Sequence, residues 1–354
     1  MSQISLPFAA LLLLNMKVPQ KILVIKLRAI GDVILATPVL ENLRHAFPQA
    51  QIDFLTEKAC AQIVAGHPAL NKILILDRQE PGAGRKLIRQ VRARRYDIVL
   101  DLFGNPRSAL LTRLSGAPRR VGFRFRIRRY AYNVKVEPRG DRVHEVEFNL
   151  DALRALEVPI VTRKLFVAVD AGSENFAARF WRENDLENRL VIGLNASGGW
   201  YTKRWPLEAF AQLGNSLQRE LNAVVLLLWG PGEYDDVKTI ARMMQEPPLL
   251  APSTNLKQLA ALLARLALLV SNDSGPLHLA AAMGTRVAGI YGPTRPDLQG
   301  PWGEGHEIAV KTGLPCLGCN GVTCKIVTHD CMKKLPVEAV WEAAQRCLHR
   351  LKPP

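Results

Sequence analysis

The sequence predicts an α/β protein built from two parallel, doubly wound sheets. Apolar runs without alternation, such as 21–26 and 190–196, are typical of strands that are covered by helices on both faces. Amphipathic stretches separate these runs, which indicates helical crossovers between parallel strands. The alternation is interrupted and restarts near residue 190, and a chain of 354 residues is long enough for two separate cores. We therefore expect two domains of the same class.

The elements of the first half follow in a regular order. Strands are expected at 21–26, 51–56, 72–77 and 97–103, and helices at 33–47, 58–66, 84–95 and 106–114. Residues 119–136 are β-rich and irregular, and 144–156 has a helical pattern. This order predicts one parallel sheet with helical connections.

The second half repeats the pattern. Strands are expected at 190–196, 223–229 and 266–270, and helices at 206–221, 233–244, 256–265 and 337–351. Pro206 suits the first position of its helix, because the amide hydrogen that proline lacks would have no partner there.

The segment 271–292 has the features of a strand end, a tight turn, a helix and a further strand. Residues 272–275 form the turn, Pro276 fits the first helical position, and Asp273 or Ser274 can cap the helix. The unpaired amides of this helix start, with Gly275 allowing close approach, suit an anion such as a diphosphate, and His278 adds a donor. A well-capped helix without a ligand is the alternative.

A second informative turn follows the first expected strand. It reads Leu-Arg-Ala-Ile-Gly-Asp over 27–32. Ligands of open α/β sheets bind beyond the carboxyl ends of strands, so Gly31 and Asp32 lie where chemistry is expected. The turn lacks the G-x-G-x-x-G spacing and therefore does not indicate a nicotinamide or flavin cofactor. Helix capping is the alternative role for Asp32.

Three motifs together carry a family resemblance. They are KLRAIGDVILATP at 26–38, KRWP at 203–206 and NDSGPLHLAAAMG at 272–284. In this order and at these separations they resemble the signatures of glycosyltransferase family 9, the ADP-heptose:lipopolysaccharide heptosyltransferases. The resemblance extends over roughly residues 21–348.

The resemblance implies a GT-B fold with two facing Rossmann-like domains. We expect an acceptor-binding domain at 17–165, a nucleotide-sugar-binding domain at 175–335 and a C-terminal helix at 336–354 that packs back toward the first domain. The implied reaction is an inverting transfer of heptose from ADP-heptose to an inner-core lipopolysaccharide acceptor. Transfer of another nucleotide sugar is one alternative, and a basic module that binds RNA or anionic lipid without catalysis is another.

The resemblance also assigns roles to residues. Asp32 matches the catalytic base of the family. Lys203 matches its phosphate-binding lysine, although a solvated surface lysine is the ordinary role of such a residue. The donor-binding residues expected are Ser197, Gly198, Lys203, Glu233, Asp273, Ser274, Gly275 and His278. Like charges repel, so we expect Asp273 to cap the helix or bind a hydroxyl group rather than contact phosphate, while Glu233 could also be simply an acid of a first helical turn.

Charge points to anionic partners. The formal net charge is +15, with a dense basic run at 119–130 and a basic helix at 85–95. If the first run is extended, Arg124, Arg126 and Arg128 form a cationic face that would bind acceptor phosphates, together with Gly31. One alternative for this run is a sheet edge protected by its charges, and another is a strand that binds RNA. Of these partners we expect the acceptor and not a nucleic acid. The basic helix could contact the inner surface of the cytoplasmic membrane or be solvated.

Neither a spanning segment nor a catalytic metal is indicated. The apolar run 6–14 is much shorter than the roughly 20 residues that cross a bilayer. We expect residues 1–15 to be a start-site extension or a surface tail, with a shallow membrane anchor as the alternative. Asp235 and Asp236 are adjacent and do not share a helix face, so transfer is expected to need no divalent cation or other cofactor.

Four of the six cysteines are clustered. Cys316, Cys319, Cys324 and Cys331 could hold a structural zinc ion, and reduced thiols in a packed loop are the expected alternative. The enzyme is expected in the cytoplasm, peripheral at the inner face of the cytoplasmic membrane.

Overall fold

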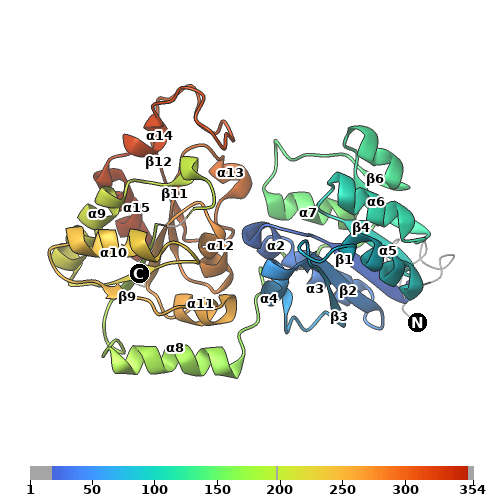
Figure 1. The fold of residues 1–354 in the computed structure, drawn as a ribbon, viewed down its shortest axis with the longest axis horizontal. Coiled ribbons are helices and arrows are strands. Elements are labelled where there is room, and N and C mark those ends of the chain that lie inside the picture. The colour runs from blue at the N-terminus through green and yellow to red at the C-terminus, as the bar shows by residue number, and fades with distance from the viewer. Residues whose placement is uncertain (1–17, 197, 350–354) are drawn as a thin grey trace, which may run out of the picture. The chain divides into compact units, whose positions relative to one another are not determined.

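The computed structural model describes residues 18–196 and 198–349, and the chain divides into two compact units between Arg163 and Lys164. Each unit contains one six-stranded sheet in which all neighbouring strands are parallel (Figure 1). The prediction of two parallel α/β sheets is confirmed. The expectation for residues 1–15 lies outside the described residues.

The sheet of the first unit has the strand order β3-β2-β1-β4-β5-β6. Its strands are β1 (Lys21–Ile25), β2 (Gln51–Glu57), β3 (Lys72–Leu76), β4 (Ile98–Asp101), β5 (Arg119–Phe123) and β6 (Val134–Val136). Its helices are α2 (Ile30–Ile34), α3 (Thr37–Ala46), η1 (Lys58–Cys60), α4 (Ala61–Val64), α5 (Ala83–Arg94), α6 (Pro106–Leu114), η2 (Arg126–Ala131) and α7 (Glu145–Arg154). From β1 the chain adds strands first on one side of the sheet, through β2 to β3, and then on the other side, from β4 to β6. The carboxyl ends of β1 and β4, where this order reverses, are the usual ligand-binding position of such a sheet.

The helix expected at 33–47 is two helices, α2 and α3. Pro38 has no amide hydrogen to donate to the carbonyl of Ile34, so the helix cannot continue there. The hydroxyl of Thr37 donates to this carbonyl instead, at 2.7 Å. The break gives α2 a length of one turn, and α2 carries Gly31 and Asp32.

The extended conformation considered for 124–128 is not formed. β5 ends at Phe123, and Arg126, with a φ of +35°, turns the chain into the short 3-10 helix η2. The ring of Phe123 stacks on Phe148 of α7 with centroids 3.9 Å apart. Ile127 does not join Phe123 and Phe125 on an apolar face, because its side chain is 82% exposed.

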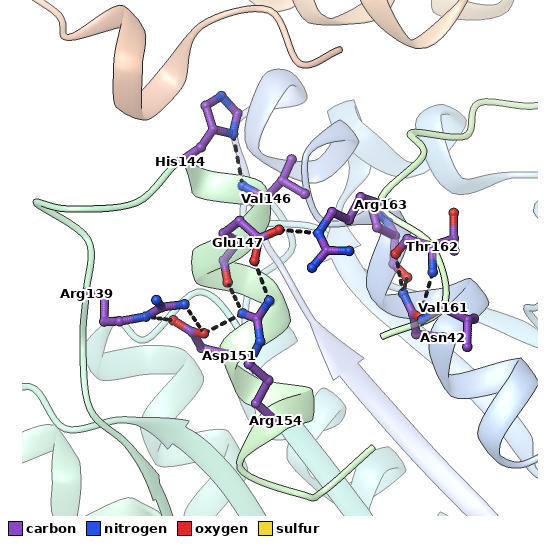
Figure 2. A network of polar contacts seen from close by, with 11 residues as sticks. Asn42, Arg139, His144, Val146, Glu147, Asp151, Arg154, Val161, Thr162 and Arg163 are labelled. Atoms are coloured by element: carbon purple, nitrogen blue, oxygen red, sulfur yellow. Dashed lines mark hydrogen bonds and ion pairs between the residues drawn. The ribbon is translucent and has the colours of Figure 1, made fainter. Parts of the chain in front are cut away.

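Helix α7 is held by a network of charged side chains (Figure 2). Glu147 pairs with Arg154 and Arg163, and Asp151 pairs with Arg139 and Arg154. Burial alone would raise the pKa of Glu147, but the hydrogen bonds from Arg154 and Arg163 hold it below its usual value. The network fixes the position of α7 over the sheet, and α7 also contributes to the site described below.

The sheet of the second unit has the order β12-β11-β10-β7-β8-β9. Its strands are β7 (Val191–Asn195), β8 (Val224–Leu228), β9 (Leu249–Leu250), β10 (Leu268–Asn272), β11 (Val287–Tyr291) and β12 (Glu307–Val310). Its helices are α8 (Ala171–Glu183), η3 (Tyr201–Lys203), α9 (Leu207–Leu221), α10 (Tyr234–Met243), α11 (Leu256–Leu263), α12 (Gly275–Ala282), α13 (Pro296–Gln299), α14 (Asp330–Lys333) and α15 (Val337–His349). The order reverses between β7 and β10, so the loops after these strands share one edge.

The last helix, α15, uses its apolar face within the second unit. Val340, Ala343, Ala344 and Cys347 are fully buried in the core formed with β10, β11 and α9. The sheet of the second unit covers this apolar face, and the expectation that the helix packs back toward the first domain stays a prediction.

Candidate active site

Asp32 lies in the first turn of α2, directly beyond the carboxyl end of β1. The N-cap of α2 is Ala29, and Asp32 caps the helix from the third position, as the acid of a capping box. Its Oδ2 atom accepts a hydrogen bond from the amide of Ala29 at 3.2 Å, and its side chain is partly exposed. The carboxylate is therefore oriented by the backbone and still accessible. Gly31 is buried in the same turn.

A buried cation stands near this carboxylate. Lys26 is 3% exposed, and its Nζ atom donates to Glu145 Oε1 at 2.7 Å, to Asn149 Oδ1 at 3.2 Å and to the carbonyl oxygen of Leu102 at 3.2 Å. Burial alone would lower the pKa of Lys26, but Glu145 and Asp32 hold it above its usual value. Sequence reasoning missed this lysine, although a charge at the end of an apolar strand was the signal.

A second buried carboxylate follows β4. The Oδ1 atom of Asp101 accepts the amides of Phe103 and Gly104 at 3.1 Å and 2.8 Å, and Oδ2 accepts the hydroxyl of Tyr132 at 2.7 Å. Burial raises the pKa of Asp101. These bonds fix the loop after β4, so Asp101 is a structural acid rather than an accessible base.

In the second unit, Lys203 and Asp273 form an ion pair. Lys203 Nζ lies 2.6 Å from Asp273 Oδ2, and the side chains are 16% and 6% exposed. Thr294 Oγ1 donates to the same oxygen at 2.6 Å, and His278 Nε2 lies 4.0 Å from Oδ1. Lys203 is therefore not a solvated surface lysine, and it comes together with Asp273 and His278, two expected donor-binding residues from a distant part of the sequence.

The start of α12 is not capped by a side chain. Its N-cap is Ser274, which makes no capping hydrogen bond. The Ser274 hydroxyl instead accepts a hydrogen bond from Asn195 Nδ2 at 2.9 Å. The carboxylate of Asp273 forms an ion pair with Lys203 and accepts a hydrogen bond from Thr294. The expectation that the side chain of Asp273 or Ser274 caps this helix is wrong, since both side chains bind residues of neighbouring segments instead.

Arg204, which sequence reasoning missed, connects the remaining donor residues. Its Nε atom donates to the carbonyl oxygen of Gly198 at 3.0 Å, and its guanidinium lies 3.6 Å from Glu233 and 3.3 Å from Asp236. Glu233 also accepts the amide of Gly230 at 2.9 Å. The loop after β7 and the loop after β8 are thus joined through one guanidinium group. Ser197 lies outside the described residues.

The three arginines expected to share a cationic face have three different environments. Arg124 pairs with Glu137 at 2.5 Å, Arg128 donates to the carbonyl oxygen of Gly104 at 2.5 Å, and Arg126 is exposed. The turn into η2 separates them, so the expected row is not formed.

The four clustered cysteines surround one small cavity of about 40 Å³, which Thr202 and His329 also line. Their thiols are free. Burial, reinforced by the other three thiols, raises the pKa of Cys331 to about 11. Within 18–196 and 198–349, no group of three or more His, Cys, Asp or Glu side chains has an arrangement that could hold a metal ion.

Comparison with known proteins identifies the family. The model of glycosyltransferase family 9 (heptosyltransferase) matches residues 84–328. The chain belongs to glycosyltransferase family 9. It is 29% identical over 291 residues to lipopolysaccharide heptosyltransferase 3 of Escherichia coli, covering 77% of this chain and 83% of that protein.

Solved structures show the same fold. A glycosyl transferase family 9 protein of Veillonella parvula superposes with a TM-score of 0.85 at 25% identity, covering 95% of this chain and 99% of that one. The Escherichia coli ADP-heptose lps heptosyltransferase II superposes with a TM-score of 0.76 at 24% identity, covering 94% and 100%. The expected GT-B fold is confirmed.

Family membership makes this glycosyltransferase family 9 protein an enzyme that uses a nucleotide-sugar donor. It disfavours the alternative of a basic module without catalysis. Among the described helices, none combines the length and the apolar character needed to cross a membrane.

Proposed function

We propose that this protein transfers heptose from ADP-heptose to an inner-core lipopolysaccharide acceptor with inversion at the anomeric carbon. The observation that carries the proposal is Asp32, an accessible carboxylate held in the first turn after β1 and faced by a buried lysine. The match to family 9 and to a lipopolysaccharide heptosyltransferase supports the sugar and the acceptor class.

The proposed chemistry is a single displacement. Asp32 takes the proton of the acceptor hydroxyl, and the hydroxyl oxygen forms a bond to the anomeric carbon of heptose. The bond between this carbon and the β-phosphate oxygen breaks, and ADP leaves with the electron pair. Because attack and departure occur on opposite faces of the sugar, the configuration inverts.

The second unit is proposed to bind the donor. The amides at the start of α12, with Gly275 at its first position, suit a diphosphate, and Lys203 supplies a positive charge. Ser197, Gly198, Ser274 and His278 are proposed to add donors, whereas Glu233 and Asp273 would bind hydroxyl groups. No divalent cation is proposed for the transfer step, because Lys203 and the helix amides would stabilise the leaving group.

The first unit is proposed to bind the acceptor. Gly31 lies beside the base, and Arg124, Arg126 and Arg128 are the proposed contacts for acceptor phosphates. Of these, Arg126 is exposed and has no ion pair with another described residue, so it is the arginine most open to such a contact. The acceptor is anionic and lipid-linked, and we propose that the enzyme works at the inner face of the cytoplasmic membrane.

The test is the substitution Asp32→Asn, which keeps the size of the side chain and removes the base. Loss of a general base should lower turnover by about 10²–10⁴-fold. The matched control is Asp141→Asn, since Asp141 is 79% exposed in the same unit. ADP-heptose and a truncated lipooligosaccharide are the substrates, and thermal unfolding monitors the fold. Turnover within a few-fold of wild type, with an unchanged unfolding temperature, would overturn the role of Asp32.

A further inference from the structure

Three elements of the first unit carry basic residues and no acidic ones. α5 has five lysine and arginine residues, α6 has two and η2 has three, while none of them contains aspartate or glutamate. α6 contacts both α5 and η2, and Figure 1 shows α5 and α6 side by side. The ten charges are thus gathered on one part of a chain whose net charge is +15.

Most of these charges are not neutralised. Six exposed arginines of this surface form no ion pair with another described residue: Arg85, Arg89, Arg92, Arg107, Arg113 and Arg126. Arg85, Arg89 and Arg92 lie on one face of α5, opposite the buried Leu87 and Val91. A field of one sign on a folded surface attracts a polyanionic partner.

The same elements expose large apolar side chains. Ile127 is 82% exposed, Tyr130 67%, Leu110 55% and Leu114 37%. Leu110 and Leu114 are four residues apart and share a face of α6, and η2 contacts this helix. Scattered exposed apolar residues are ordinary, but a group of four among unpaired arginines marks an interaction surface.

An apolar hollow of about 310 Å³ opens between α5 and α6. Leu87 and Ile88 line it from α5, and Leu110 and Leu111 from α6. The two carboxylates that also line it, Asp77 and Glu80, are paired with lysines. The surface therefore offers both cationic groups and apolar contact to an amphipathic anion.

We propose that the α5–α6–η2 surface docks this enzyme on an anionic phospholipid bilayer. Exposed aliphatic groups gain by entering the boundary between headgroups and acyl chains, and Tyr130 presents an amphipathic ring suited to that depth. Arginines around them attract anionic headgroups, and the combination of apolar and polybasic contacts gives stable peripheral binding. A nucleic acid fits less well, because base stacking needs aromatic platforms and Tyr130 is the exposed aromatic residue of these elements.

The inference rests on the proposed function only in that a lipid-linked acceptor lies in such a membrane. The experiment measures co-sedimentation of the full chain with phosphatidylcholine vesicles and with vesicles in which about a third of the lipid is phosphatidylglycerol. We expect binding to the anionic vesicles alone, weakened by added salt. The variant R85Q/R89Q/R92Q should bind about 100-fold more weakly, because each charge near the surface changes binding about fivefold. I127S/Y130S should also lose binding.

Matched controls remove the same groups elsewhere. R142Q/R179Q/R219Q takes away three exposed arginines outside the surface, and V161S removes a side chain that is 53% exposed. Both controls should bind like wild type. Equal loss in control and test variants, or binding to neutral vesicles as strong as to anionic ones, would overturn the proposal. Tighter binding to a single-stranded RNA, lost in the same variants, would overturn it in favour of nucleic acid.

Failure of this inference can be told apart from failure of the proposed function. D32N should bind anionic vesicles like wild type, and the two surface variants should keep wild-type turnover on a deacylated, water-soluble acceptor. Wild-type transfer by D32N contradicts the catalytic proposal alone. Unchanged vesicle binding by both surface variants contradicts the membrane surface alone.

Discussion

Replacing Lys203 by methionine should destabilise the second unit, because the change leaves Asp273 as a buried carboxylate without its cation. The two charges lie 2.6 Å apart and are 16% and 6% exposed. At an effective dielectric constant of 20, their attraction is about 6 kcal/mol, from which desolvation subtracts a large part. Removing one partner of a buried pair costs about 3–5 kcal/mol, and partial exposure of Lys203 favours the lower end.

The partner substitution, Asp273→Asn, should cost less. The amide oxygen of asparagine can still accept the hydroxyl of Thr294, and Lys203 can turn toward solvent. We expect a loss of about 1–2 kcal/mol for D273N and a coupling energy of about 2 kcal/mol in the cycle with K203M. For a unit of this size, the loss of 3 kcal/mol in K203M lowers the unfolding temperature by about 6–12 °C.

Urea unfolding of wild type, both single variants and the double variant measures the coupling. Calorimetric titration with ADP measures the functional consequence, since Lys203 is the proposed cation for the diphosphate. K203M should weaken ADP binding, because the diphosphate loses its proposed cation. The control is K238M, whose ion-pair partner Asp235 is 89% exposed, so the loss should be under about 1 kcal/mol. Single losses that add within about 0.5 kcal/mol in the double variant would refute the reasoning.

Three further predictions concern a histidine and a thiol. His278→Ala should weaken ADP binding and turnover more than Arg89→Ala does; equal effects in titration and turnover assays would move the donor site away from α12. The raised pKa of Cys331, about 11, predicts that iodoacetamide at pH 8 labels the exposed Cys319 long before Cys331, as mass spectrometry can follow. The pKa of Cys331 in the folded protein is above the ordinary value of 9.0, so its contribution to the free energy of unfolding is complete below pH 9 and is lost as the pH rises toward 11. Unfolding curves measured across this pH range should show the loss.

The sequence by itself determined the class of fold and the two turns at which the site is proposed. Strands such as β1 and β7 are uniformly apolar because helices cover both faces of a parallel sheet, and that pattern can be seen along a few consecutive residues. The turn after β1 and the start of α12 were predicted for the same reason, since turn residues and helix starts are local signals. Pro38 is a local signal for a helix break as well, but the helix was expected to continue across it from 33 to 47.

Only the tertiary structure decided which side chains meet. Arg124, Arg126 and Arg128 do not form a row, because Phe123 stacks on a ring of α7 and the chain turns after it. Lys26 meets Glu145 from 119 residues away, and the pair between Lys203 and Asp273 joins two loops of one sheet edge. The apolar face of α15 likewise packs against the sheet of its own unit. Such contacts depend on packing between distant elements, whereas local patterns state only which face of an element is apolar or charged.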